Sequence, residues 1–223
     1  MGKIKAVLFD CDGLMFNTEK IAQQIWIDSA AENGIPLPDD FIIRITGAGG
    51  PDVHRYIEDV VKDPEVIRKT SGKRFDLDFW GSFPKGELVM KGLEELCVYL
   101  KANGYKIGIA SSSSKAYVET LLQNATIPIE YDALCAGDMV KHAKPDPEIF
   151  LMCASLLGAE PDECLVLEDS RQGVLAAKRA GMHPGFVPDT IAADDEMKEI
   201  IEYTFEDLSK VIDLLKEDAC TGS

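Results

Sequence analysis

The sequence predicts an α/β protein with a doubly wound parallel sheet and an inserted helical segment. Short apolar runs alternate with amphipathic helical patterns over most of the chain, which is typical of βαβ units with right-handed crossovers. Residues 16–83 carry little strand signal and show helical patterns instead. We therefore expect a Rossmann-like core at residues 1–15 and 84–223, and an all-helical cap domain at residues 16–83.

The first predicted strand is the apolar run Ala6–Phe9, which ends in Asp10, Cys11, Asp12 and Gly13. A short apolar run bounded by charge and glycine is typical of a buried parallel strand. In open α/β sheets, ligands bind at the carboxyl ends of such strands. Two carboxylates this close together require a cation or a solvated position, and a divalent metal ion is the usual partner.

The cap block predicts several helices. Thr18 fits the N-cap of the first helix, because a threonine hydroxyl can accept from a free backbone N–H group. A glycine-rich stretch at 46–50 precedes Pro51, which suits the first turn of another helix. Residues 63–80 are expected to be helical, with a break near Gly72.

Alternating strands and helices are predicted after Pro84, because apolar stripes with helical spacing separate short apolar runs. The expected strands lie at residues 105–110, 133–136, 165–167 and 186–187, and the expected helices near residues 93–100, 118–122, 147–157, 174–180 and 205–215.

The composition is that of a globular protein, with 46% hydrophobic and 28% charged residues. The formal net charge is −16, from 23 Lys and Arg against 39 Asp and Glu. This acidity repels nucleic acid and anionic membranes. We therefore expect a small-molecule substrate and no nucleic-acid or membrane partner. We also expect a monomer.

The six cysteines show no C-x-x-C spacing, and most lie inside apolar runs, with Cys220 as the exception. This pattern is typical of reduced core cysteines in a cytosolic protein. The basic residues at 1–5 are not followed by a signal-peptide pattern, and no segment has the length of a membrane span. A cytoplasmic location is expected.

Polar residues follow four of the predicted strands. They are Asp10, Asp12, Ser111, Lys144, Glu168 and Asp169. If these strands are parallel neighbours, the side chains converge on one crevice. Carboxylates for a metal ion, a hydroxyl, a lysine and a candidate nucleophile together indicate phosphoryl transfer.

The sequence resembles the haloacid dehalogenase superfamily of phosphohydrolases, within it the β-phosphoglucomutase-like branch with a helical cap. The resemblance covers nearly the whole chain. The matching segments are Asp10–Gly13, Ile109–Ser111, Lys144–Pro147, Leu167–Ser170, Gly173 and Ala180–Gly181.

The resemblance implies a role for each core residue. Asp10 would attack phosphorus and become an aspartyl phosphate. Asp12 would protonate the leaving alkoxide and later take a proton from water. Ser111, Ser112 and Lys144 would hold the phosphoryl oxygens.

The resemblance also implies a magnesium ion. Its ligands would be Asp10, the backbone carbonyl of Asp12, and Asp169, with Glu168 beside them as a ligand or a supporting group. Oxygen ligands of this kind suit Mg²⁺ better than Zn²⁺.

Several of these residues also allow a structural interpretation. The Asp10–Gly13 segment alone would fit a turn after a strand. Ser113 and Ser114 fit a helix N-cap. We interpret the three histidines as surface or structural residues, with His54 on a cap helix and the other two in loops.

The cap favours a phosphatase over a hexose-phosphate mutase, which is the alternative. The mutases grip a second phosphate with a basic cap loop, whereas the stretch at 46–50 holds no Lys or Arg. Ala22 stands where the mutases have a histidine. A metal- or phosphate-binding module without catalysis is a third reading, which the complete motif set disfavours. Four cap cations are unranked candidates for substrate contacts, namely Arg44, Arg55, Lys73 and Arg74.

Overall fold

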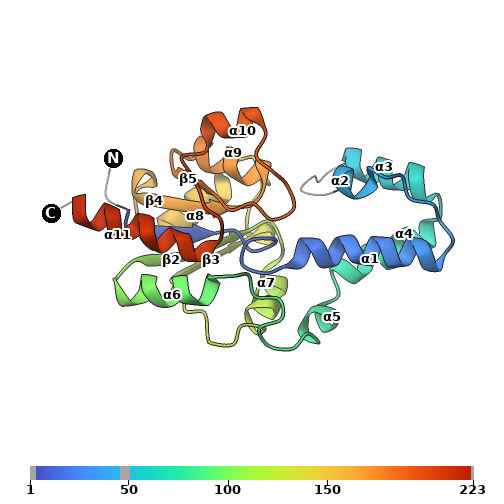
Figure 1. Ribbon diagram of the computed structural model, residues 1–223, viewed down its shortest axis with the longest axis horizontal. Helices are drawn as coiled ribbons and strands as arrows, with labels where there is room; N and C mark the ends of the chain where they lie inside the picture. Colours follow the sequence, from blue (N-terminus) through green and yellow to red (C-terminus); the bar gives the residue numbers. More distant parts are fainter. Residues whose placement is uncertain (1–3, 46–50, 222–223) are drawn as a thin grey trace.

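The computed structural model describes residues 4–45 and 51–221, and its centre is a six-stranded parallel sheet (Figure 1). The spatial order of the strands is β3-β2-β1-β4-β5-β6. The strands are β1 (Ala6–Phe9), β2 (Lys106–Ser111), β3 (Ala133–Ala136), β4 (Cys164–Glu168), β5 (His183–Phe186) and β6 (Tyr203–Thr204). The expected α/β class with a doubly wound sheet is confirmed.

Strand β1 lies in the middle of the sheet and is buried along its whole length. Phe9 is in register with Ile109 of β2 and with Leu167 of β4. Strand β2 continues for two residues and β4 for one residue beyond the end of β1. This register places the residue after Phe9 between the ends of both neighbouring strands.

Helices cover both faces of the sheet, because alternate residues of each strand point to opposite faces. Val7 and Phe9 pack into a cluster with α6 and α11, whereas Ala6 and Leu8 pack into a second cluster with α8 and α9. The helices of the core are α6 (Leu93–Ala102), α7 (Lys115–Leu122), α8 (Glu148–Leu157), α9 (Arg171–Arg179), α10 (Asp195–Ile200) and α11 (Val211–Thr221).

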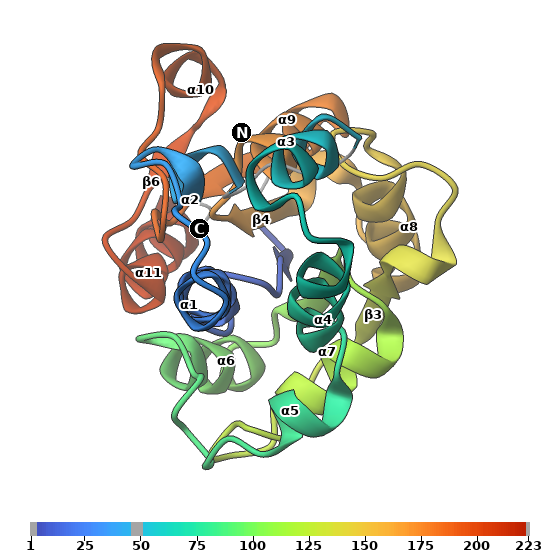
Figure 2. The same ribbon diagram turned by 90° about the vertical axis from the view of Figure 1, so that its right-hand side faces the viewer.

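The helices of the inserted segment project from one end of the core (Figure 1). They are α1 (Thr18–Glu32), α2 (Phe41–Ile45), α3 (Pro51–Val61), α4 (Pro64–Arg74) and α5 (Leu77–Gly81). Helix α4 lies beside both α1 and α3 (Figure 2). Phe41, Ile57 and Ile67 form a small apolar cluster that is separate from the core.

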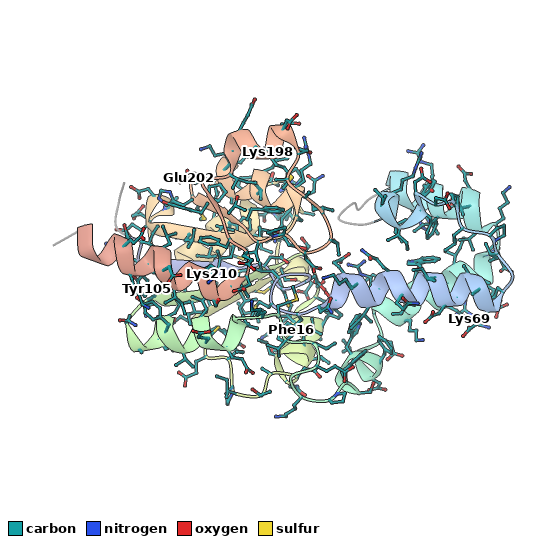
Figure 3. All side chains as sticks on the ribbon, in the orientation of Figure 1. Phe16, Lys69, Tyr105, Lys198, Glu202 and Lys210 are labelled. Carbon is teal, nitrogen blue, oxygen red and sulfur yellow. The ribbon has the colours of Figure 1, made fainter. Side chains whose placement is uncertain are left out.

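Helix α5 packs mainly against α7. Trp80 is fully buried in the main core cluster, and Phe16 of the same cluster lies at the junction of core and cap (Figure 3). The division into core and cap remains our proposal.

The structure differs from the sequence predictions inside the cap. Thr18 is the first helical residue instead of the N-cap, and the N-cap residue Asn17 makes no side-chain cap. The break between α4 and α5 lies at Phe75 and Asp76, not near Gly72, because Asp76 caps α5 and so starts a new helix. The glycine-rich stretch at 46–50 lies outside the described residues.

The carboxyl-terminal part holds elements that the sequence did not predict. Helix α10 and the short strand β6 were missed, and α11 begins only at Val211, after a 3-10 turn. His183 lies in β5 instead of a loop. Its ring is buried and contacts the Glu202 carboxylate and the Asp162 carbonyl oxygen, so its structural interpretation fits these contacts.

Five of the cysteines are buried, and the side chain of Cys220 lies outside the described part. Among the helices described, none has both the length and the apolar character needed to cross a membrane.

Asp207 provides a test of fold stability. Its carboxylate accepts hydrogen bonds from the backbone and hydroxyl of Ser209 and pairs with Lys91 at 2.6 Å. The ion pair with Lys91 and these hydrogen bonds lower the pKa of Asp207 from 3.8 to about 2. A folded-state pKa below the unfolded value stabilises the fold above pH 4, and this contribution is lost as the pH falls towards 2.

We predict that Asp207→Asn lowers the free energy of unfolding by about 1–2 kcal/mol at pH 7. Near pH 2 the difference from wild type should become small. Urea titrations of variant and wild type at pH 7 and near pH 2 measure this difference in the free energy of unfolding. The exposed Asp213 of α11 supplies the control, since Asp213→Asn should show no such difference. An equal loss at both pH values would contradict the prediction.

Candidate active site

One cavity of about 830 Å³ opens between the carboxyl end of the sheet and the cap. Its core side is lined by Asp10, Asp12, Ser112, Ser113, Tyr117, Lys144 and Asp169. Its cap side is lined mainly by apolar residues, among them Ile25, Trp26, Val53, Ile57 and Phe75.

Lys144 holds the acidic residues of the core together. Its ammonium group donates to Asp10 Oδ1 at 2.5 Å, to Glu168 Oε1 at 2.6 Å and to the Ala110 carbonyl oxygen at 3.0 Å. Burial disfavours the charged amine, but the two carboxylates outweigh this effect and raise the pKa of Lys144. The lysine therefore carries a positive charge inside the site.

Asp10 directly follows β1 and is buried beside other acids. Burial raises the pKa of Asp10 to about 8, and the Glu168 and Asp12 carboxylates add to this rise, whereas Lys144 opposes it. Burial, with the charges of Glu168 and Asp10, also raises the pKa of Asp169. A single lysine does not balance this concentration of negative charge, so the site calls for a further cation.

The acids Asp10, Glu168 and Asp169 each offer an oxygen within 4.8 Å of the others. Such a donor set fits a hard divalent cation such as Mg²⁺. Glu168 Oε1 is bonded to Lys144, and its Oε2 accepts from the backbone and hydroxyl of Ser170. The carboxylates of Asp10 and Asp169 are therefore better placed to bind the ion, while Glu168 orients Lys144.

The carboxylate of Asp12 is surrounded by hydroxyl groups. Oδ1 accepts from Thr18 at 2.9 Å and from Tyr117 at 2.9 Å, and Oδ2 accepts from Ser113 at 2.7 Å and Ser111 at 3.5 Å. We call Thr18, Ser113 and Tyr117 the hydroxyl cradle. Burial and the adjacent Asp12 raise the pKa of Tyr117, so its phenol stays protonated.

The serine turn after β2 differs in detail from the prediction. Ser114 caps α7, as expected, because its hydroxyl accepts from the Tyr117 backbone. Ser113 makes no cap and instead donates to Asp12. Ser111 is fully buried and accepts from the Ser113 backbone N–H group, and Ser112 and Ser113 line the cavity. The role of Ser111 in phosphate binding stays a prediction.

The structure also adds residues that sequence reasoning missed. Besides Thr18, Ser113 and Tyr117, these include Glu19, which pairs with Arg74 at 2.5 Å in the cavity wall. One available signal was the position of Glu19 in the first turn of the helix that leaves the Asp10–Gly13 loop. The contacts of Tyr117 had no local signal, because they depend on the fold.

The four candidate cap cations separate in the structure. Arg74 lines the cavity, whereas Arg44 pairs with Asp40, and Lys73 lies over the Phe79 ring. Arg55 is absent from the described lining of this cavity.

Comparison with known proteins identifies the family. Residues 4–181 match the family model of haloacid dehalogenase-like hydrolases. Hexitol phosphatase B of Escherichia coli K12 is 27% identical, over 92% of this chain and 97% of its own length. The phosphorylated carbohydrates phosphatase of Thermotoga maritima is 31% identical, over 80% of this chain and 82% of its own.

The similarity extends to longer proteins and to solved structures. The chain is 31% identical, over 81% of its length, to a part of the SUPPRESSOR OF QUENCHING 1 protein of Arabidopsis thaliana, and spans 17% of that protein. The crystal structure of β-phosphoglucomutase from Clostridium difficile aligns with a TM-score of 0.72 and 22% identity. The alignment covers 98% of each chain and shows the shared fold, including the helical cap.

Gly13, at the end of the Asp10–Gly13 segment, lies against the Asp169 carboxylate and provides a test of the metal site. A Cβ atom at this position would lie 2.2 Å from Asp169 Oδ2, and the backbone has a φ of +75°. We predict that Gly13→Ala displaces Asp169 and weakens Mg²⁺ binding at least about tenfold. Calorimetric titration with MgCl₂ measures this affinity directly.

Gly34→Ala is the matched control. Gly34 also has a positive φ, +65°, but a Cβ atom there would meet nothing within 4 Å. Both variants carry the backbone cost of a left-handed alanine, about 1 kcal/mol. Equal Mg²⁺ affinities in the two variants would refute the placement of Asp169 at the ion.

Proposed function

Because the chain belongs to the haloacid dehalogenase-like hydrolases, we propose that it is a Mg²⁺-dependent phosphatase that forms an aspartyl phosphate on Asp10. Its substrates would be small phosphorylated metabolites. The observation that carries the proposal is the group of Asp10, Lys144, Glu168 and Asp169 at the carboxyl end of the central strand, with Asp12 beside it.

Each side chain has a task that its position allows. Asp10 attacks phosphorus, and the oxygen–phosphorus bond of the substrate breaks towards the alcohol oxygen. Asp12 gives its proton to that oxygen and later removes a proton from the attacking water. Lys144, Ser112 and nearby backbone N–H groups hold the phosphoryl oxygens.

The metal ion would be held by the carboxylates of Asp10 and Asp169 and by the Asp12 backbone carbonyl. When bound, it supplies positive charge that offsets the nucleophile and the phosphoryl oxygens. Lys144 alone cannot do this, because its charge is already shared between Asp10 and Glu168. The same ion would also relieve the repulsion among the buried carboxylates.

The cap supports a phosphatase over a mutase. Arg74 is the cap cation among the described residues that line the cavity, and its guanidinium is paired with Glu19. Ala22, which also lines the cavity, has no group to donate. A second phosphate on the substrate would therefore lack an unpaired cation in this wall. The names of the phosphatase relatives support sugar or polyol phosphates as the substrate class.

We predict that Asp10→Asn reduces Mg²⁺-dependent hydrolysis of p-nitrophenyl phosphate at least about 10³-fold, because the amide cannot attack phosphorus. Circular dichroism checks that the variant is folded. The surface variant Asp213→Asn should retain wild-type activity. Full activity of Asp10→Asn would exclude an aspartyl phosphate at this residue.

A second prediction separates phosphatase from mutase. With β-glucose 1-phosphate and a trace of β-glucose 1,6-bisphosphate, we expect any reaction to release inorganic phosphate without accumulation of glucose 6-phosphate. Phosphate release and a coupled glucose-6-phosphate dehydrogenase assay measure the two products. Rapid formation of glucose 6-phosphate that depends on the bisphosphate would favour the mutase.

A further inference from the structure

Tyr117 contacts Asp12 from the core side of the cavity. It lies in the first turns of α7, its side chain is buried, and its hydroxyl donates to Asp12 Oδ1 at 2.9 Å. Neither the sequence motifs nor the mechanism above assigns it a role. Its hydroxyl donates to the same oxygen, Asp12 Oδ1, as the hydroxyl of Thr18, which belongs to α1.

The ring of Tyr117 is held by its neighbours. It meets the Trp80 ring edge-on, with centroids 5.7 Å apart and an interplanar angle of 84°. Trp80 is itself fully buried, and its indole N–H group donates to the Arg74 carbonyl oxygen at 2.8 Å. Asn124 donates to the Trp80 carbonyl oxygen at 3.1 Å. The phenol is therefore fixed by packing, because a tyrosine hydroxyl cannot move without its ring.

This rigidity distinguishes Tyr117 from the other members of the hydroxyl cradle. Thr18 and Ser113 have short side chains that sit at the start of α1 and in the serine turn. A rotation about χ1 alone would move either hydroxyl away from Asp12. The Tyr117 hydroxyl stays in place while the carboxylate accepts from it.

We propose that Tyr117 is a positioning residue, which orients the Asp12 carboxyl group towards the oxygen of the departing alcohol. The inference rests on the proposed function. In the first step a bond forms between Asp10 and phosphorus, and the bond from phosphorus to the alcohol oxygen breaks. The electron pair stays on that oxygen, which takes the proton of Asp12. A misdirected Asp12 slows this step most when the alcohol is a poor leaving group.

The test compares two aryl phosphates of nearly equal shape. p-Nitrophenolate leaves readily without a proton, whereas phenolate needs one. For Tyr117→Phe we expect kcat/KM to fall about tenfold with phenyl phosphate and less than about threefold with p-nitrophenyl phosphate. The ratio of the two kcat/KM values is measured on one preparation of each variant, so a reduced fraction of active enzyme cancels in the ratio. Because kcat/KM reports the steps up to departure of the alcohol, hydrolysis of the intermediate does not enter it.

Tyr105→Phe is the matched control. Tyr105 is also buried, and its hydroxyl donates to the Leu215 carbonyl oxygen at 3.4 Å, at the end of the core away from the cap (Figure 3). Loss of this hydroxyl should leave the substrate ratio unchanged. Trp80→Phe, which weakens the support of the Tyr117 ring, should change the ratio in the same direction as Tyr117→Phe.

The outcomes separate the inference from the proposed function. Equal losses with both substrates in Tyr117→Phe, or no loss with either, would overturn the positioning role. Asp12→Asn should show the same preference for p-nitrophenyl phosphate to a larger extent. If Asp12→Asn shows no such preference, the proton-donor role of Asp12 itself is wrong. If Asp12→Asn shows the preference for p-nitrophenyl phosphate and Tyr117→Phe does not, the proposed function stands and the inference falls.

Discussion

The structure depends on the compensation of negative charge at the end of β1. Asp10, Glu168 and Asp169 are buried within reach of one another, and burial of like charges is costly unless cations and hydrogen bonds offset it. Lys144 supplies one such cation, with its ammonium group between Asp10 and Glu168. The acids and the lysine are thus parts of one electrostatic unit, which the proposed divalent ion would complete.

Close backbone approach makes this unit possible. At Gly173, near the start of α9, a Cβ atom would lie 1.8 Å from the Glu168 carboxyl group. At Gly137, a Cβ atom would lie 2.0 Å from the Ser112 carbonyl oxygen. Both glycines therefore let one segment of chain lie against another at the cavity. At these two positions glycine is required for space and not for conformational freedom.

Much of the fold could be predicted from the sequence, because apolar runs mark buried parallel strands directly. Strands β1 and β3 were predicted with their observed bounds, and β2 and β4 are buried runs of the same kind. The pair Tyr203–Thr204 carries no such run, and α10 is a mainly polar helix, so neither gave a signal. Edge elements of this kind are determined by their neighbours in space.

For the site, the sequence predicted which strand ends would converge, and the sheet order brings Asp10, Lys144 and Glu168 together. It could not predict the contacts around Asp12. Ser113 and Tyr117 lie 101 and 105 residues from Asp12 in the chain, and their local patterns fit a turn and an apolar helix face. Pairing of this kind becomes visible only after the tertiary fold is known.

The packing of α5 has a mechanical consequence. Because Trp80 is anchored in the core and held by Asn124, this helix belongs with the sheet and not with the helices beyond it. Any rotation of α1–α4 would then pivot at the short segment between Arg74 and Leu77. Thr18 and Phe75 would travel with the moving wall, whereas Ser113 and Tyr117 would stay behind. The core-side support of Asp12 is thereby attached to a different body from the enclosing surface, so Ser113 and Tyr117 can hold the carboxylate in place when the chamber opens and Thr18 moves away.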